Sequence, residues 1–201
     1  MTNEPISLHS PHLRRARRLI ESSIAGMAVG QMTWAPEGKW SSANLLEHLS
    51  LGFLITAKGC RMVLRQGGPE LPKPTLHQRW LAFRVLVLGY FPMRVIAPKM
   101  VCPRGLGPED AQRSLLENIA EMDRMMRQCE EKFGSKREML SHPYLGPLTI
   151  KQWRKFQLFH VRRHMKQLRT LRQQMTGNSR ELGGACASVT GAMHGSGPYA
   201  Q

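Results

Sequence analysis

Two histidines, His160 and His164, lie four residues apart in the segment FQLFHVRRHMKQL. On an α-helix, residues i and i+4 lie one above the other, about 6 Å apart, so two imidazoles at this spacing can bind one metal ion. Trp153 and Phe156 precede the two histidines on the same helical face, which predicts that both imidazole rings point towards the protein interior. A shared metal ion would satisfy both rings, whereas an unpaired inward imidazole is costly.

An isolated His-x-x-x-His pattern arises readily by chance, and its rings can instead bond core carbonyls or solvent at the end of a bundle. A third histidine, His48, strengthens the metal interpretation because it shares a predicted inner stripe with Leu45 and Ile55. Three imidazoles from two facing helices form an open, zinc-type site that leaves positions for water or substrate. Imidazole ligation suits zinc, nickel, copper or iron, and we expect zinc or nickel.

Other residues with reactive side chains give weaker signals. Glu47 adjoins His48 but is predicted to point about 100° away around the helix, so no general base is identified and the catalytic residues stay unknown. Cys60 and Cys129 fall on predicted helices and are expected to be small core residues rather than nucleophiles. His142 lies in a Pro/Gly turn, where a plain loop role is favoured over a place at the mouth of the site.

Four amphipathic segments are predicted to position these side chains. They span about residues 11–27, 41–65, 108–133 and 149–176. Ser41 or Ser42 can cap the second helix, Pro108 suits the first position of the third, and Thr149 with Gln152 fits a capping box at the fourth. No strand-like alternation is present, so we predict an all-α fold, a four-helix bundle.

An additional apolar helical segment, residues 78–102, separates the second and third core helices. It carries four basic residues and two prolines, whereas a membrane-spanning helix needs about 18 or more apolar residues with few charges. We predict a helix over about 78–90, followed by an irregular apolar stretch over the core. An element lying on a membrane surface is the weaker alternative.

Composition limits the possible partners and the compartment. The chain has 201 residues, is 41% hydrophobic and has a formal net charge of +15. A basic excess can attract nucleic acid or an anionic membrane, but the basic residues are spread along the chain, so a solvated basic surface is favoured. The four cysteines form no CxxC pair and the first residues contain no apolar signal-peptide core, so we expect a reducing, cytoplasmic setting.

The end of the chain differs in composition from the rest. From Gly177 onward the residues are mostly small, and they show no helical periodicity. We therefore predict one domain over residues 1–176 and a disordered C-terminal tail over residues 177–201.

Two segments, WAPEGKWSSANLLEHL and HPYLGPLTIKQWRKFQLFHVRRHMKQL, resemble the DinB-like (YfiT-like) superfamily of four-helix-bundle metalloproteins. The wording of the second is closest to an uncharacterised branch of that superfamily. The resemblance covers about residues 10–175 and implies metal ligands at His48, His160 and His164. It also implies a homodimer. Some members of the superfamily use low-molecular-weight thiols, so the resemblance makes such a thiol a candidate partner.

Three hypotheses follow from these patterns. The first is a divalent-metal-dependent enzyme, either a thiol-dependent transferase or a hydrolase, because such an ion lowers the pKa of a bound water or thiol. The second is a non-catalytic metal-binding or interaction protein with the same fold. The third, which we favour least, is a basic protein that binds nucleic acid or an anionic membrane.

Overall fold

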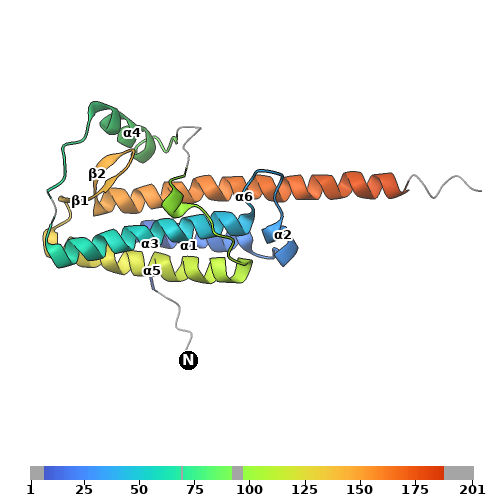
Figure 1. Cartoon of the computed structure of the whole chain (residues 1–201), viewed down its shortest axis with the longest axis horizontal. Coiled ribbons are helices and arrows are strands. Elements are labelled where there is room, and N and C mark those ends of the chain that lie inside the picture. Colours follow the sequence, from blue (N-terminus) through green and yellow to red (C-terminus); the bar gives the residue numbers. More distant parts are fainter. Residues whose placement is uncertain (1–6, 69, 92–96, 188–201) are drawn as a thin grey trace, which may run out of the picture.

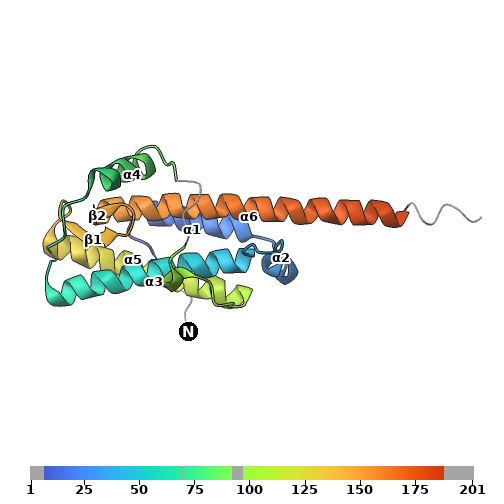
Figure 2. The same ribbon diagram turned by 45° about the horizontal axis from the view of Figure 1, so that its top comes forward.

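The computed structural model describes residues 7–68, 70–91 and 97–187, and for residues 176–187 it describes the backbone alone. Four long helices form the main body: α1 (Pro11–Ile24), α3 (Ser42–Gln66), α5 (Pro108–Phe133) and α6 (Ile150–Ala187). They run side by side in both views, with α3 packed along α5 and α1 along α6 (Figures 1 and 2). The predicted all-α four-helix bundle is thus confirmed.

Smaller elements connect the long helices. They are α2 (Val29–Thr33), α4 (Leu76–Leu86), the 3-10 turn η1 (Lys99–Val101), and the strands β1 (Glu138–His142) and β2 (Gly146–Thr149). The strands pair antiparallel between α5 and α6, which the sequence pattern did not predict. They are short, and β2 is buried along most of its length, so neither shows the alternation of a half-exposed strand.

The helices that carry the histidines begin where their caps predict. The Ser41 hydroxyl accepts a hydrogen bond from the backbone N–H of Asn44 at 3.2 Å, and the Asn44 side chain accepts one from the N–H of Ser41 at 3.1 Å. Thr149 and Gln152 exchange the same pair of bonds at 3.3 Å and 2.8 Å. These capping boxes define the first turns of α3 and α6, and so the helical phase of the histidines that follow.

Helix α6 is longer than its sequence pattern predicts. It continues to Ala187, and its C-terminal part projects beyond the ends of the other long helices (Figure 1). Leu168 is the last fully buried side chain in the part of α6 whose side chains are described. The division into a domain over residues 1–176 and a tail over residues 177–201 stays a prediction, and residues 188–201 lie outside the described chain.

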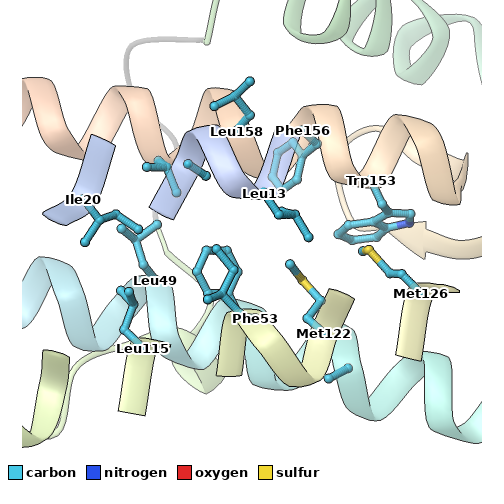
Figure 3. Packing of buried hydrophobic residues seen from close by; sticks show 14 of the residues in the cluster. Leu13, Ile20, Leu49, Phe53, Leu115, Met122, Met126, Trp153, Phe156 and Leu158 are labelled. Atoms are coloured by element: carbon cyan, nitrogen blue, oxygen red, sulfur yellow. The ribbon is translucent and has the colours of Figure 1, made fainter. Parts of the chain in front are cut away.

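The core fills the space between the four long helices. Figure 3 shows side chains from all four directed into a common interior. Phe53 of α3 is fully buried, as are Leu13 of α1 and Leu115 and Met122 of α5. Close packing of large side chains in this interior fixes the long helices relative to one another.

A buried polar network joins three of the helices. The Asp123 carboxylate of α5 accepts hydrogen bonds from the backbone N–H groups of His9 and Ser10, at the start of α1. Arg154 of α6 lies 3.9 Å from Asp123 and forms a second ion pair with Glu130 at 2.5 Å. Because Asp123 and Arg154 are both buried, loss of either partner would leave the charge of the other less well compensated in the interior.

The predicted extra segment between the second and third core helices contains α4. This helix begins at Leu76 and ends at Leu86, somewhat earlier than the predicted span of 78–90. It packs against α6 and β2, and its buried side chains are Leu81, Val85 and Leu86. Within the described parts of the chain, no helix combines the length and the apolar character that crossing a bilayer requires.

Candidate metal centre

The three predicted histidines lie together between α3 and α6. His48 comes from α3, while His160 and His164 come from successive turns of α6. Each contributes one ring nitrogen to a group in which all the nitrogens lie within 4.8 Å of one another. His48 and His164 are buried, and His160 is half-buried. The convergence expected from helical phase is therefore present in the structure.

Hydrogen bonds determine which ring nitrogen carries the proton in two of these histidines. His48 Nδ1 lies 2.8 Å from the carbonyl oxygen of Val101, which can only accept, so Nδ1 carries the proton and Nε2 keeps a free lone pair. His164 Nδ1 lies 2.7 Å from the side-chain oxygen of Gln167 and donates to it in the same way. Partners of this kind orient metal-binding imidazoles in many proteins.

The Nε2 atoms of His48 and His164 both lie close to His160 Nε2. His160 Nε2 lies 3.3 Å from His48 Nε2 and 2.9 Å from His164 Nε2. A proton on His160 Nε2 can be donated to only one of these two lone pairs, which leaves the other unsatisfied. Ligands at about 2.05 Å from a tetrahedral ion would lie about 3.3 Å apart, close to the two distances from His160 Nε2. The donor set therefore fits a divalent metal ion.

The surroundings keep the three imidazoles neutral, as ligation requires. Burial lowers the pKa of His48, and it lowers the pKa of His164 to about 3. Burial, followed by the neighbouring His164, holds the pKa of His160 well below its usual value. Lone pairs on all three rings are thus available at neutral pH.

A loop held by Glu47 supplies the carbonyl that orients His48. The Glu47 carboxylate is buried and accepts hydrogen bonds from the backbone N–H groups of Arg104 at 2.8 Å, Gly105 at 3.0 Å and Leu106 at 3.0 Å. The sequence pattern predicted that Glu47 points away from the ligand face, and it gave no role for the side chain. The one sequence feature that could have indicated this role is the presence of an acidic residue within an apolar stretch of helix.

Aromatic side chains enclose the histidine cluster. The Phe156 ring stacks on the His160 ring, with centroids 5.5 Å apart and an angle of 21° between the planes. Trp40 lies beside His48 at 5.0 Å, and Phe91 lies 6.4 Å from His160. These rings surround the nitrogens with apolar material, which strengthens electrostatic interactions with any bound ion.

The cluster opens into a cavity of about 1280 Å³. Helices α3, α4 and α6, the β-hairpin and the segment around η1 all contribute to its wall. The polar side chains on the wall include Gln157, Gln167 and Arg163, whereas no described residue lining it is an aspartate or glutamate. The site therefore combines metal-type ligands with a large, mainly apolar chamber, and it offers no carboxylate general base from the described residues.

His142 also lines this cavity, although a plain loop role was favoured from the sequence. Its ring packs edge-on against Phe156 with centroids 4.6 Å apart. Its Nδ1 accepts hydrogen bonds from the backbone N–H groups of Tyr144 at 3.2 Å and Leu145 at 3.3 Å. Burial lowers the pKa of His142 to about 4, so the ring is neutral at pH 7.

The cysteines on the helices occupy the core, as predicted. Cys60 and Cys129 are fully buried, and the Cys129 thiol donates a hydrogen bond to the Cys60 carbonyl at 3.5 Å. A hydrogen bond with Cys129, together with burial, raises the pKa of the Cys60 thiol. Neither thiol lines the cavity, so neither is placed to act as a nucleophile there.

Comparison with known families agrees with this architecture. A family model described as the DinB superfamily matches residues 12–168, a range that contains all three histidines. No curated protein and no solved structure matches the chain significantly.

Proposed function

This chain belongs to the DinB superfamily, and on that premise we propose that it binds one divalent metal ion through His48, His160 and His164. The observation that carries the proposal is that the Nε2 atoms of His48 and His164 both lie within 3.3 Å of His160 Nε2, and that bonds at Nδ1 leave the Nε2 lone pairs of His48 and His164 free. Three neutral nitrogen ligands favour zinc or nickel among the common divalent ions.

We further propose that the bound centre is catalytic. Catalytic metal sites keep an open position, and here the cluster faces a cavity larger than the roughly 300–1000 Å³ usual for small-molecule pockets. That volume has room for a low-molecular-weight thiol and a second substrate, or for one large substrate of a hydrolase. The divalent ion would supply Lewis acidity at this position.

The chain's own residues have separate tasks in this scheme. The aromatic rings of Trp40, Phe91 and Phe156 exclude water from the cluster. Gln157 and Arg163 provide polar contacts on the cavity wall for orienting a substrate. Because no described carboxylate lines the wall, the proposed reaction is one in which the nucleophile needs no carboxylate base.

Metal content tests the ligand assignment. We expect wild-type protein, purified without an affinity tag and incubated with zinc or nickel, to hold about one ion per chain, and His160→Gln or His164→Gln to hold far less while keeping its helicity. His9→Gln, at an exposed histidine, is the matched control and should retain the metal. Wild-type protein that binds no divalent ion would contradict the proposal.

Turnover tests the catalytic part separately. Metal-loaded and metal-free protein would be compared with a small thiol and an electrophile, and with ester and amide substrates. Activity that depends on the metal and is lost in His48→Gln supports an enzyme. Full metal binding without any turnover would leave the alternative, a non-catalytic metal-binding or interaction protein of the same fold.

Assembly and compartment complete the proposal. We expect a homodimer, as the family resemblance implies, and a cytoplasmic setting, since the spacing of the four cysteines suggests no disulfide framework. Size-exclusion chromatography with light scattering would measure the oligomeric state directly, and a monomeric mass would contradict the expected homodimer.

A further inference from the structure

Helix α4 exposes an apolar stripe to solvent. Leu76, Trp80, Phe83 and Val87 are 83%, 52%, 54% and 59% exposed. Their spacing of four, three and four residues places them along one side of the helix and its C-cap. The opposite side is already buried against α6 and β2, so folding of the chain does not account for this second apolar surface.

Basic side chains border the stripe on both sides. At 100° per residue, Arg79 falls on one flank of the stripe and Arg84 on the other. The sequence from Leu71 to Pro108 contains no aspartate or glutamate. An apolar stripe between cationic flanks is the pattern of a helix that lies in the interface of an anionic bilayer.

Arg84 also connects the stripe with Tyr90, an exposed aromatic residue outside it. Its guanidinium lies 4.5 Å from the centroid of the Trp80 ring and 4.2 Å from that of Tyr90. Both rings are about half exposed. Trp and Tyr favour the headgroup region of bilayers, and arginine can hold its charge there while its stem contacts apolar groups.

The position of α4 leaves this surface accessible. In both views α4 stands on the outer side of α6, away from α3 and α5 (Figures 1 and 2). Trp80 and Arg84 also line the cavity in front of the histidines. The exposed stripe therefore adjoins the cavity wall.

We propose that the α4 face, defined as Leu76, Trp80, Phe83 and Val87 with Arg79 and Arg84, docks onto an anionic lipid surface. Its charge is complementary to such a surface. A second copy of the same face would bring arginines against arginines without an acidic partner. Nucleic acid would leave the leucine and valine without apolar contact, since duplex binding relies mainly on phosphate contacts.

A different basic cluster is the strongest competitor for anionic lipid. Arg15 and Arg18 of α1 lie beside Arg162, Lys166 and Arg169 of α6. This cluster has no exposed apolar stripe, so it can supply electrostatic attraction but little insertion into the bilayer.

Vesicle binding tests the proposal with the full, untagged chain. We expect it to sediment with phosphatidylcholine vesicles that contain phosphatidylserine and to remain in solution with phosphatidylcholine alone. Added salt should reduce binding without abolishing it, because the apolar contribution is not screened. Tryptophan fluorescence should shift to the blue and be quenched by brominated lipid as Trp80 enters the interface.

Paired variants separate the two parts of the face. Leu76→Ser with Phe83→Ser should lower vesicle binding by about tenfold or more, because affinity scales with the apolar area buried. The matched control is Val29→Ser with Met62→Ser, which removes exposed apolar side chains elsewhere and should bind as wild type. All four positions are exposed, so circular dichroism and metal content should be unchanged in both variants.

Charge reversal gives the second comparison. Arg79→Glu with Arg84→Glu should reduce binding strongly, whereas Arg15→Glu with Arg18→Glu, which lowers the net charge equally, should reduce it much less. An equal loss in both variants would assign binding to the α1–α6 cluster or to net charge alone.

Three further results would overturn the proposal. The first is that wild-type protein does not bind anionic vesicles. The second is that the Leu76→Ser and Phe83→Ser double variant binds them as tightly as wild type. The third is that wild-type protein forms a dimer without lipid and the double variant is a monomer. The last result would identify the occupant of the α4 face as a second copy of the chain.

Discussion

At the scale of single residues, the site depends on atoms that the sequence pattern does not reveal. Helical phase predicted that His48, His160 and His164 face one another, but the Val101 carbonyl and the Gln167 side chain determine which nitrogen each of two rings offers. Both partners bind Nδ1 and leave Nε2 for the centre. The hydrogen-bonding state of each ring is therefore as important as its position.

Gln167 gives a direct test of that orientation. Gln167→Met keeps the volume but removes the oxygen that accepts from His164 Nδ1, so we expect metal affinity to fall by about tenfold. Gln167→Glu keeps an acceptor at this place and should bind the metal at least as tightly as wild type. Competition with a fluorescent chelator measures both constants, and equal affinities in all three proteins would rule out the orienting role.

His142 predicts a pH dependence of stability. Its folded pKa of about 4 lies below the unfolded value of about 6.5, so its contribution to folding is fully present above pH 6.5 and is lost as the pH falls towards and through 4. His142→Asn keeps an acceptor for the Tyr144 and Leu145 N–H groups but cannot be protonated. The variant should lose less stability than wild type between pH 6.5 and 4 in urea titrations, and parallel losses would contradict this origin.

At the scale of elements, the Glu47 side chain determines where the loop that precedes α5 lies against the histidine site. Glu47 anchors the loop at Arg104, Gly105 and Leu106, and the same loop presents the Val101 carbonyl to His48. Adjacent residues of α3 therefore serve one purpose on two faces of the helix. This coupling explains how a segment of irregular structure can supply a precisely placed oxygen.

The attachment of α1 to the bundle predicts a large effect at Asp123. Asp123→Ala removes the acceptor for the start of α1 and leaves Arg154 partly uncompensated, so we expect a loss of about 3 kcal/mol. The corresponding fall in melting temperature is about 6–12 °C for a domain of this size.

A matched exposed pair provides the control for that variant. Asp110→Ala removes an ion pair with Arg113 in which both side chains are exposed, and it should cost no more than about 0.5 kcal/mol. Thermal unfolding followed by circular dichroism compares the two variants. Equal losses in both would show that the buried network does not hold α1 in place.

The long helices and their caps could be predicted because local signals specify them. Ser41 and Thr149 each begin a helix by bonding nearby backbone groups, and the histidines follow at fixed helical phase. The β-hairpin could not, since its two strands are short and lack the alternation of a half-exposed strand. The role of Glu47 could not either, since it depends on contacts with a distant part of the chain. The exposed side of α4 was also missed, because an apolar run does not reveal which of its faces is covered.

At the scale of the whole molecule, we predict that the end of α6 can be removed without loss of the bundle's stability. The matched family range ends at residue 168, which is also the last fully buried position in the part of α6 with described side chains. A chain ending at Thr176 should therefore keep its melting temperature within about 2 °C and keep its metal affinity. Unfolding of this shortened chain would place the domain boundary further along α6.

The central claim is that three histidines hold one divalent ion. X-ray absorption fine structure of zinc-loaded wild-type protein measures the ligands directly. We predict three imidazoles at about 2.0–2.1 Å and no sulfur ligand, with fewer imidazoles in His160→Gln. Scattering from sulfur at about 2.3 Å, or an imidazole count unchanged by His160→Gln, would contradict the assignment of His48, His160 and His164 as the metal centre.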